Sequence, residues 1–315
     1  FPRRRRYTVD GMNEATGTAR IERIVYGGMG LAHVEGRACF IPCTAPGDTV
    51  EFNVTRRAKG VLFAEAARIV EPSPLRREPA CPVFGRCGGC HFLHLDYADE
   101  IEIKRETVLD ALARIAGITT ELAGFIACPE RFGYRNHALF KVGTGGETGF
   151  SRRESNAIVP FPAGGCLLLP RRMRRAIADL PPASLEPGAK IRTRLDAFGA
   201  VHFWGLRGAP GPPDVLMETG GLRFPVQPEA FFQVNRHLNP DLMRLVAGLP
   251  RAPVRRALDV YCGTGFFTLP LAGVAGEAIG IEIQRQACRG ALAAAKLNRV
   301  SNVKFIRDSA ARALA

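Results

Sequence analysis

The segment ALDVYCGTGFFTLPLA, residues 257–272, constrains the fold of this chain more than any other part of the sequence. The apolar run Ala257–Tyr261 predicts a strand, residues 262–265 form a glycine turn, and residues 267–272 begin a helix. Glycine lets the backbone approach a ligand closely, and the free amides at a helix start can bind the ligand's polar groups. The segment therefore predicts the nucleotide-binding turn of an α/β Rossmann-like domain.

A carboxylate after the next predicted strand narrows the choice of cofactor. The run AIGIEI ends at Glu282, nineteen positions after Gly263, where a carboxylate can accept hydrogen bonds from ribose hydroxyls. A dinucleotide motif would have its third glycine at the position of Thr268, whereas Asp259 in the preceding strand suits S-adenosylmethionine. The pattern favours a methyltransferase. A nicotinamide oxidoreductase and a glycine turn without any ligand are the alternatives.

The chain is strongly basic, with 43 lysine and arginine residues, a net charge of +13 and a pI near 9.8. This charge favours a nucleic-acid partner, because each neutralised phosphate releases counterions. Only six of the basic residues are lysines, so an arginine-rich proteome is the competing explanation. No apolar run approaches the ~20 residues that span a bilayer, and the start FPRRRRYTVD lacks the apolar core of a signal peptide. We therefore expect a cytoplasmic protein with no membrane partner.

Residues 7–71 show short runs rich in Val, Ile and Phe, separated by turn signals such as Gly27-Gly28 and Pro46-Gly47-Asp48. This pattern is typical of a small antiparallel β-barrel of the OB-like kind, which often binds RNA along a basic groove. Solvated surface positions are the competing interpretation for each basic residue. The residues that could line such a groove are Arg20, Arg23, Arg37, Arg56, Arg57, Lys59 and Arg68.

The rest of the chain divides at its prolines. Pro72, Pro74 and Pro79 mark a linker after the barrel. Residues 96–116 predict one helix, capped by Asp96 and ended by Gly117. We expect a central α+β domain formed by residues 72–95 and 118–249, with the helix at 96–117 packed on a methyltransferase domain that begins at residue 250.

Nine cysteines in a chain without an export signal favour metal binding over disulfides. Cys81, Cys87 and Cys90 form a C-x5-C-x2-C run with two glycines before the last, and Cys166 also follows two glycines. Converging thiolates select an iron–sulfur cluster or zinc. We favour the cluster; zinc completed by His91 or His94, and unligated buried thiols, are the alternatives. The cysteines at 39, 43, 128 and 288 have no such setting and predict small core or surface residues.

Taken together, these segments resemble the RNA uracil-5 methyltransferase family, in the branch with an N-terminal TRAM barrel and an iron–sulfur cluster. Any one motif is weak, but their order along nearly the whole chain is specific. The matching segments are GGMGLAHVEGR, PGDTVE, CGGC with HLDYADEIEIK, GYRNHALF, GFSRRESNAIV with Cys166, FFQVN and DVYCGTGFFTLPLA.

The resemblance implies C5-methylation of uridine in RNA, with S-adenosylmethionine and a 4Fe-4S cluster as cofactors. By position, Cys81, Cys87, Cys90 and Cys166 would hold the cluster, and the cofactor contacts would be Gln233, Tyr261, Gly263, Gly265, Glu282 and Asp308. Two positions depart from the family pattern: Phe266 replaces a common asparagine, and Leu93 a common glutamine. The first departure removes one polar contact to the cofactor.

Family members use a cysteine nucleophile in an SCNP-like motif and a later general base, and neither motif occurs in this sequence. Cys262 lies in the cofactor turn and is not expected to be that nucleophile. After Pro250 we count three predicted strands, fewer than such a sheet usually has, so we expect both catalytic groups beyond Ala315 and a 315-residue chain that is inactive alone. We expect a monomer acting on ribosomal RNA; a transfer-RNA enzyme and a non-catalytic iron–sulfur RNA-binding module are the alternatives.

Overall fold

The computed structural model describes residues 16–250, 252 and 254–314. The first residues of the predicted barrel, 7–15, therefore lie outside the described part. The described chain forms two compact units, one made of the residues up to Phe125 with Ser151–Ala157, the other of Ile126–Phe150 with the residues from Ile158 on. In this division residues 72–95 group with the barrel, and the predicted domain boundaries stay a prediction.

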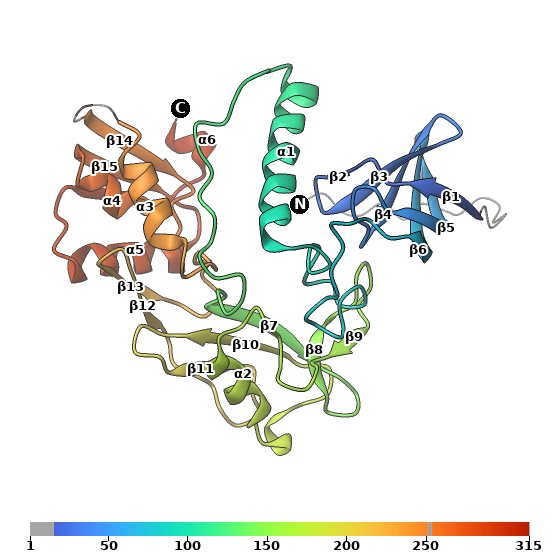
Figure 1. The fold of residues 1–315 in the computed structure, drawn as a ribbon. Coiled ribbons are helices and arrows are strands. Elements are labelled where there is room, and N and C mark those ends of the chain that lie inside the picture. Colours follow the sequence, from blue (N-terminus) through green and yellow to red (C-terminus); the bar gives the residue numbers. More distant parts are fainter. Residues whose placement is uncertain (1–15, 251, 253, 315) are drawn as a thin grey trace. The chain divides into compact units, whose positions relative to one another are not determined.

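The first unit contains a curled six-stranded sheet in the order β1-β5-β6-β4-β3-β2, drawn in blue in Figure 1. Alternate side chains of its strands point into one apolar core that includes Ile41, Val50 and Phe52, each at most 2% exposed. The N-terminal β-domain is thus confirmed. Its strands are β1 (Thr16–Arg20), β2 (Arg23–Val25), β3 (Met29–Val34), β4 (Arg37–Pro42), β5 (Thr49–Ala58) and β6 (Val61–Glu71).

One strand pairing of this sheet differs from the predicted antiparallel pattern. β4 and β6 pair in parallel, through Cys39 with Leu62 and Phe40 with Phe63. Strand β5 lies between β1 and β6 in the sheet and runs antiparallel to β6. The chain therefore passes from β4 across the position of β6 to β5, and then comes back as β6, which pairs with β4 in parallel. The local alternation of apolar residues could not reveal this crossover.

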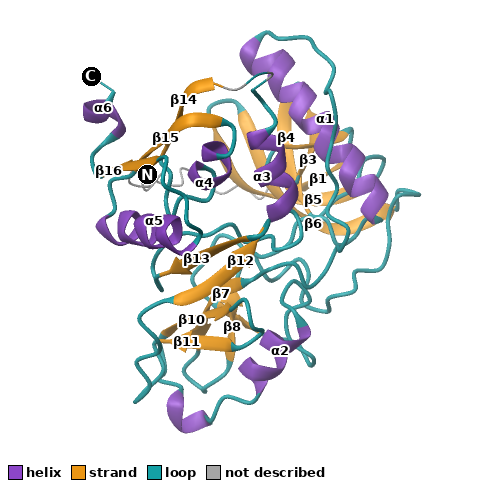
Figure 2. Ribbon diagram, turned by 90° about the vertical axis from the view of Figure 1, so that its left-hand side faces the viewer, coloured by secondary structure: helices purple, strands orange, loops and turns teal. Residues whose placement is uncertain are grey.

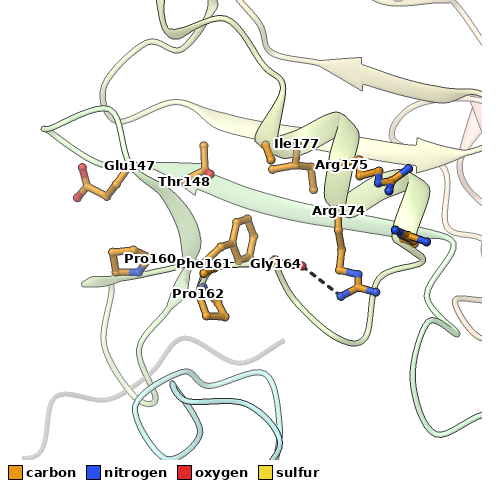
Figure 3. A pocket seen from close by; sticks show the side chains of 13 residues that line it. Glu147, Thr148, Pro160, Phe161, Pro162, Gly164, Arg174, Arg175 and Ile177 are labelled. Atoms are coloured by element: carbon orange, nitrogen blue, oxygen red, sulfur yellow. Dashed lines mark hydrogen bonds between the residues drawn. The ribbon is translucent and has the colours of Figure 1, made fainter.

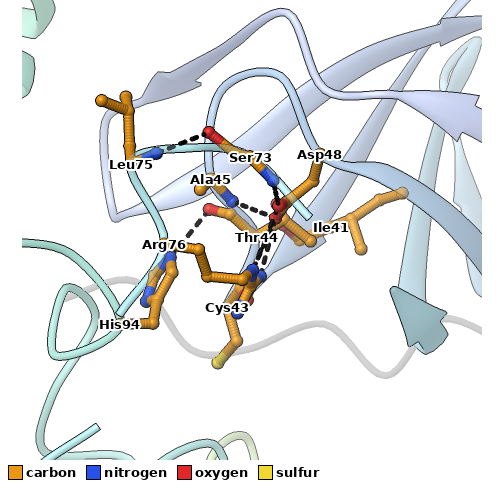
Figure 4. A network of polar contacts seen from close by, with 9 residues as sticks. All are labelled: Ile41, Cys43, Thr44, Ala45, Asp48, Ser73, Leu75, Arg76 and His94. Atoms are coloured by element: carbon orange, nitrogen blue, oxygen red, sulfur yellow. Dashed lines mark hydrogen bonds and ion pairs between the residues drawn. The ribbon is translucent and has the colours of Figure 1, made fainter. Parts of the chain in front are cut away.

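A buried polar network joins the barrel to the segment that follows it (Figure 4). The Asp48 carboxylate is fully buried; it accepts hydrogen bonds from the amides of Ala45 (2.6 Å) and Ser73 (2.8 Å), and from Arg76 Nη2 (2.7 Å). Burial alone would raise the pKa of Asp48, but the bonds from Arg76, Ala45 and Ser73 outweigh it and lower the pKa. His94 Nε2 lies 3.0 Å from the Thr44 carbonyl oxygen in the same region. These contacts explain why residues after the barrel group with it.

Helix α1 (Tyr97–Ala116) confirms the predicted helix and its end at Gly117, which adopts a left-handed conformation at φ 67°. Asp96 occupies the N-cap position, but its side chain makes no capping bond and instead pairs with Arg77 at 2.8 Å. Ile103 is the buried residue of the helix and packs with Ile24 of β2. The predicted packing of this helix on the methyltransferase domain stays a prediction.

The second unit begins with a five-stranded sheet in the order β11-β10-β7-β8-β9. One face of this sheet packs against helix α2 (Arg171–Ala178) through Phe140, Met173 and Ile191, all fully buried. A 3-10 turn, η1 (Pro182–Ser184), follows α2. The strands are β7 (His137–Val142), β8 (Thr148–Ser151), β9 (Ile158–Pro160), β10 (Lys190–Leu195) and β11 (Val201–Trp204).

A hairpin and a helix lead from this sheet to the α/β part of the unit. Strands β12 (Val215–Thr219) and β13 (Leu222–Val226) pair in an antiparallel hairpin, and α3 (Asn239–Ala247) follows. Phe224 of β13 and Met243 of α3 lie in the same apolar core as residues of the glycine turn. This core therefore fixes the hairpin beside the turn.

The chain then forms a parallel three-stranded sheet in the order β14-β15-β16 (Figures 1 and 2). The strands are β14 (Val254–Val260), β15 (Ala275–Ile281) and β16 (Val303–Ile306); the helices are α4 (Thr268–Ala272), α5 (Arg285–Leu297) and α6 (Ala310–Ala313). Helix α4 contacts β14 and β15, and α5 contacts β16 and β13. This alternation confirms the predicted α/β part. None of the helices in the described ranges has the length and apolarity needed to cross a membrane.

Candidate functional site

The candidate site lies at the carboxyl edge of the parallel sheet, where the strands β14, β15 and β16 end. Tyr261 follows β14, Glu282 follows β15, and Asp308 stands two positions after β16. Because neighbouring parallel strands end at the same edge, these three predicted residues are brought together. Ligands of open α/β sheets bind at this edge.

The glycine turn is closed by backbone bonds across the sheet and by one carboxylate. The amides of Tyr261 and Cys262 both donate to the Ile281 carbonyl oxygen, at 2.8 and 3.0 Å. The Gly263 amide donates to Glu282 Oε2 at 3.0 Å, and the Gln284 amide to Glu282 Oε1 at 2.8 Å. A carboxylate has about four acceptor sites. Two of those on Glu282 thus remain for a ligand's hydroxyl groups, which fits a ribose.

Two glycines permit the close packing behind the turn. A Cβ on Gly265, whose φ is 81°, would lie 2.9 Å from Leu269 Cδ1, and a Cβ on Gly280 would lie 2.7 Å from Cys262 Sγ. Any other residue at Gly265 would be strained by the positive φ, and a side chain at Gly280 would press on Cys262 and the Phe305 ring. The sequence motif singled out Gly265, while Gly280 could be found only from the structure.

Asp259, near the end of β14, is partly buried, and Cys262 in the turn is buried. Asp259 accepts a hydrogen bond from the Thr268 hydroxyl at 2.6 Å, and burial raises the pKa of this aspartate. Burial, and then the neighbouring Asp259, raise the pKa of Cys262 to about 12. A thiol with this pKa is protonated at neutral pH. The sequence-based expectation that Cys262 is not the nucleophile stays a prediction.

Gln233 lies on an irregular segment whose main chain is held by two asparagines. The Gln233 carbonyl oxygen accepts bonds from Asn136 Nδ2 (2.8 Å) and Asn239 Nδ2 (3.1 Å). The preceding Phe232 is buried and contacts Phe266 of the glycine turn edge to face, with ring centroids 5.6 Å apart. This aromatic contact places the FFQVN segment beside the turn.

The role of Phe266 was not visible in the sequence. It stood out only as a departure from the family pattern, whereas the structure shows it 5% exposed within the core that also contains Phe224 and Phe232. Its ring therefore anchors the turn instead of facing a ligand. A run of two phenylalanines after a glycine turn was the available signal.

Exposed apolar side chains surround the polar groups of the site. Tyr261 is 76% exposed and adopts φ 68°, Ile283 is 65% exposed next to Glu282, and Phe231 is 67% exposed next to the buried Phe232. Positive φ at a tyrosine is uncommon and is often found at functional sites. Sequence analysis identified Tyr261 but missed Ile283 and Phe231.

Cys81, Cys87 and Cys90 lie on a loop that packs against residues 151–153. The Gly88 amide donates to the Ser151 carbonyl oxygen at 3.1 Å, and Arg153 Nη2 donates to the Cys90 carbonyl oxygen at 3.3 Å. Burial is the main reason that the pKa of Cys87 is raised, and the nearby Cys81 adds to the effect. Cys166 belongs to the second unit. Within the described residues, no three His, Cys, Asp or Glu side chains gather as a metal site, so the predicted cluster is not shown.

Comparison with solved structures identifies the fold. The structure resembles that of Pyrococcus abyssi tRNA (uracil-54, C5)-methyltransferase in complex with S-adenosyl-L-homocysteine, with a TM-score of 0.70, 23% identity, and coverage of 93% of this chain and 79% of that one. This chain therefore shares the fold of that enzyme.

Comparison with sequences identifies the family. Residues 18–75 match the TRAM domain of tRNA (uracil(54)-C(5))-methyltransferase, and residues 218–314 match the tRNA (uracil-5-)-methyltransferase family. The 23S rRNA (uracil(1939)-C(5))-methyltransferase RlmD of Pseudomonas aeruginosa is 31% identical over 94% of this chain and 75% of its own length. An uncharacterized RNA methyltransferase of Aquifex aeolicus is 28% identical over 90% of this chain and 76% of its own length. The chain belongs to the RNA uracil-5 methyltransferase family.

Proposed function

We propose that this protein uses S-adenosylmethionine to methylate C5 of a uridine in 23S ribosomal RNA, in the cytoplasm and as a monomer. The observation that carries the proposal is the carboxyl edge of β14–β16, where Glu282 fixes the glycine turn and keeps acceptor sites for a ribose. Membership of the family supports the reaction class.

When bound, S-adenosylmethionine supplies an electrophilic methyl group on its sulfonium sulfur. In our proposal Glu282 accepts hydrogen bonds from the ribose hydroxyls, and the positive-φ glycines 263 and 265 let the backbone approach the cofactor. Asp308 accepts from the adenine edge, with Oδ1 already bonded to the Ser309 amide at 2.7 Å. Ile283 and Tyr261 provide the apolar surfaces beside these contacts.

Gln233 completes the proposed cofactor contacts from the other side of the turn. Its backbone is fixed by Asn136 and Asn239, so its side chain amide is presented at a defined place. The Phe232–Phe266 contact couples that place to the turn. We infer that this coupling aligns Gln233 with the cofactor, because both segments share one core.

We prefer ribosomal RNA over transfer RNA because relatives in Pseudomonas aeruginosa and Azoarcus that are 31% identical to this chain are named as 23S rRNA enzymes. The observation that supports transfer RNA as the alternative substrate is the fold likeness to the Pyrococcus abyssi enzyme. The test incubates the product of the complete gene with S-adenosylmethionine and unmodified transcripts of either RNA, followed by mass spectrometry of the nucleosides. We expect 5-methyluridine in 23S rRNA. Its appearance only in tRNA favours the alternative, and cofactor binding without any methylation favours a non-catalytic RNA-binding module.

We also propose that Cys81, Cys87, Cys90 and Cys166 hold a 4Fe-4S cluster. This part rests on the cysteine spacing and on Gly88, where a Cβ would lie 3.3 Å from the Ser151 carbonyl oxygen, so that glycine lets the cysteine loop pack closely against residues 151–153. Iron and acid-labile sulfide are to be measured in protein purified without oxygen. Four of each per chain are expected from the cluster type, with loss in Cys87→Ser but not in Cys128→Ser. Zinc without sulfide would contradict this assignment.

A further inference from the structure

The short helix α2 carries four arginines in the sequence RRMRRAIA. Met173 and Ile177 face the sheet core and are buried. Arg171, Arg174 and Arg175 line a cavity on another side of the helix, shown in Figure 3. Arg172 does not line it; its Nη1 donates to the Gly199 carbonyl oxygen at 3.2 Å. Three of the four arginines therefore face the cavity, and one does not.

The cavity has a volume of about 510 Å³ and combines a basic side with an apolar wall. Pro160, Phe161 and Pro162 form the wall, and the Phe161 ring is fixed by an edge-to-face contact with Phe150 at 4.9 Å. Glu147 is the one acidic residue among the lining residues. Three arginines against one carboxylate leave an excess of two positive charges, which suits an anionic ligand.

These arginines are unfavourable for the helix itself. The first turn of α2 contains no acidic residue and no side-chain cap, so the positive end of the helix dipole meets further positive charge. Arg171 and Arg175 are four positions apart, a spacing at which like charges repel. None of the four arginines pairs with a carboxylate of a described residue. Uncompensated charge of this kind is expected where a polyanion binds.

The cavity wall is built around one of the arginines. Arg174 Nη1 donates to the Gly164 carbonyl oxygen at 3.1 Å, while its buried Nε has no partner among the described atoms. Gly164 and Gly165 both have positive φ, and a Cβ on Gly165 would lie 3.1 Å from Arg174 Cβ. The loop therefore wraps closely around this side chain.

We propose that this cavity binds the phosphate–ribose backbone of the RNA substrate, away from the cofactor turn. Arg171 and Arg175 would each neutralise a phosphate, and Pro160 to Pro162 would contact the sugars. This inference rests on the proposed function for its choice of RNA. An acidic protein segment is the competing ligand.

The test compares Arg171→Gln/Arg175→Gln with the control Arg172→Gln, which removes the same charge type from the same helix outside the cavity. Binding of fluorescein-labelled oligouridine and of transcribed 23S rRNA is measured by anisotropy at several salt concentrations. Each lost phosphate contact lowers the slope of log K against log salt by about one, so we expect a drop of about two in the double variant and none in the control. Thermal melting should show no loss of stability, because glutamine removes repulsion from the helix.

Other outcomes overturn the proposal. Unchanged slopes in the double variant, or equal drops in both variants, would mean that the cavity binds no RNA. A loss of polyglutamate binding with RNA binding intact would assign the cavity to an acidic protein. S-adenosylmethionine binding, measured calorimetrically on the same proteins, separates this result from the proposed function: its absence in the wild type would refute that function while leaving the salt slopes interpretable.

Discussion

Replacing Asp48 by asparagine tests whether the buried network holds the barrel to the segment after it. Asparagine keeps the shape of the side chain, but one of its oxygens becomes an amide group facing the donors of Arg76, Ala45 and Ser73. Removing one partner of a fully buried ion pair costs about 3–5 kcal/mol. Here Asp48 is fully buried but the Arg76 side chain is 21% exposed, so water can partly solvate the charge that remains. The asparagine keeps one acceptor oxygen for these donors. We therefore expect the free energy of unfolding to fall by about 3 kcal/mol, the lower end of this range.

Differential scanning calorimetry measures this loss. A loss of about 3 kcal/mol corresponds to a fall of roughly 10–20 °C in the Tm of the barrel unit. The control is Glu51→Gln, which breaks the solvent-exposed ion pair with Arg68 on the same barrel and should change the Tm little. The folded-state pKa of Asp48 is lowered. The ionised carboxylate therefore contributes its full share to the free energy of unfolding above the unfolded-state pKa of ~4. This share is lost as the pH falls through the folded-state pKa. A Tm of Asp48→Asn within about 2 °C of wild type at neutral pH would refute the reasoning.

Two further predictions concern the glycine turn. Phe266→Ala should lower the free energy of unfolding of the second unit by about 3–5 kcal/mol and weaken S-adenosylmethionine binding, because it removes a buried ring that contacts Phe232. Urea denaturation followed by Trp204 fluorescence measures the first effect, with the exposed Phe198→Ala as control, and equal stability of Phe266→Ala and wild type would contradict it. Cys262 should resist iodoacetamide at pH 8 until the protein unfolds, because its pKa is about 12. Rapid labelling of Cys262 in the native protein would contradict this account. Above the ordinary thiol pKa near 9.0 the Cys262 thiol ionises in the unfolded state but not in the folded state, so the free energy of unfolding should fall as the pH rises.

Much of the α/β part could be predicted from the sequence because its signals are local. The apolar runs before Tyr261 and Glu282 bracket a glycine turn, and the rule that parallel strands end at one edge places both residues together. Helix α1 was equally clear, since its apolar spacing ends at a glycine that adopts the left-handed conformation. In each case the residues that specify the element lie within a few positions of one another.

Features that depend on contacts between distant segments could not be predicted. The parallel pairing of β4 with β6 follows from where β5 lies, which no alternation pattern records. Phe266 was recognised as unusual, but its contact with Phe232 joins segments more than thirty positions apart. Asp96 stood at the right position for a cap, yet its carboxylate pairs with Arg77. Helix α2 was only part of a general α+β region, because eight residues with four arginines show little apolar periodicity.

The central claim is that Glu282 and the glycine turn bind S-adenosylmethionine, and isothermal titration calorimetry of the 315-residue chain tests it most directly. Hydrogen bonds to charged groups are worth about 1.5–3 kcal/mol each, so losing the two proposed ribose bonds in Glu282→Ala should raise the Kd by about a hundredfold or more. Glu277→Ala is the matched control, because that carboxylate lies on β15, the strand that Glu282 follows, and pairs with Arg256 outside the site. Wild type and control should bind the cofactor alike. A wild-type chain that does not bind it, or a Glu282→Ala variant within about threefold of wild type, would contradict the account.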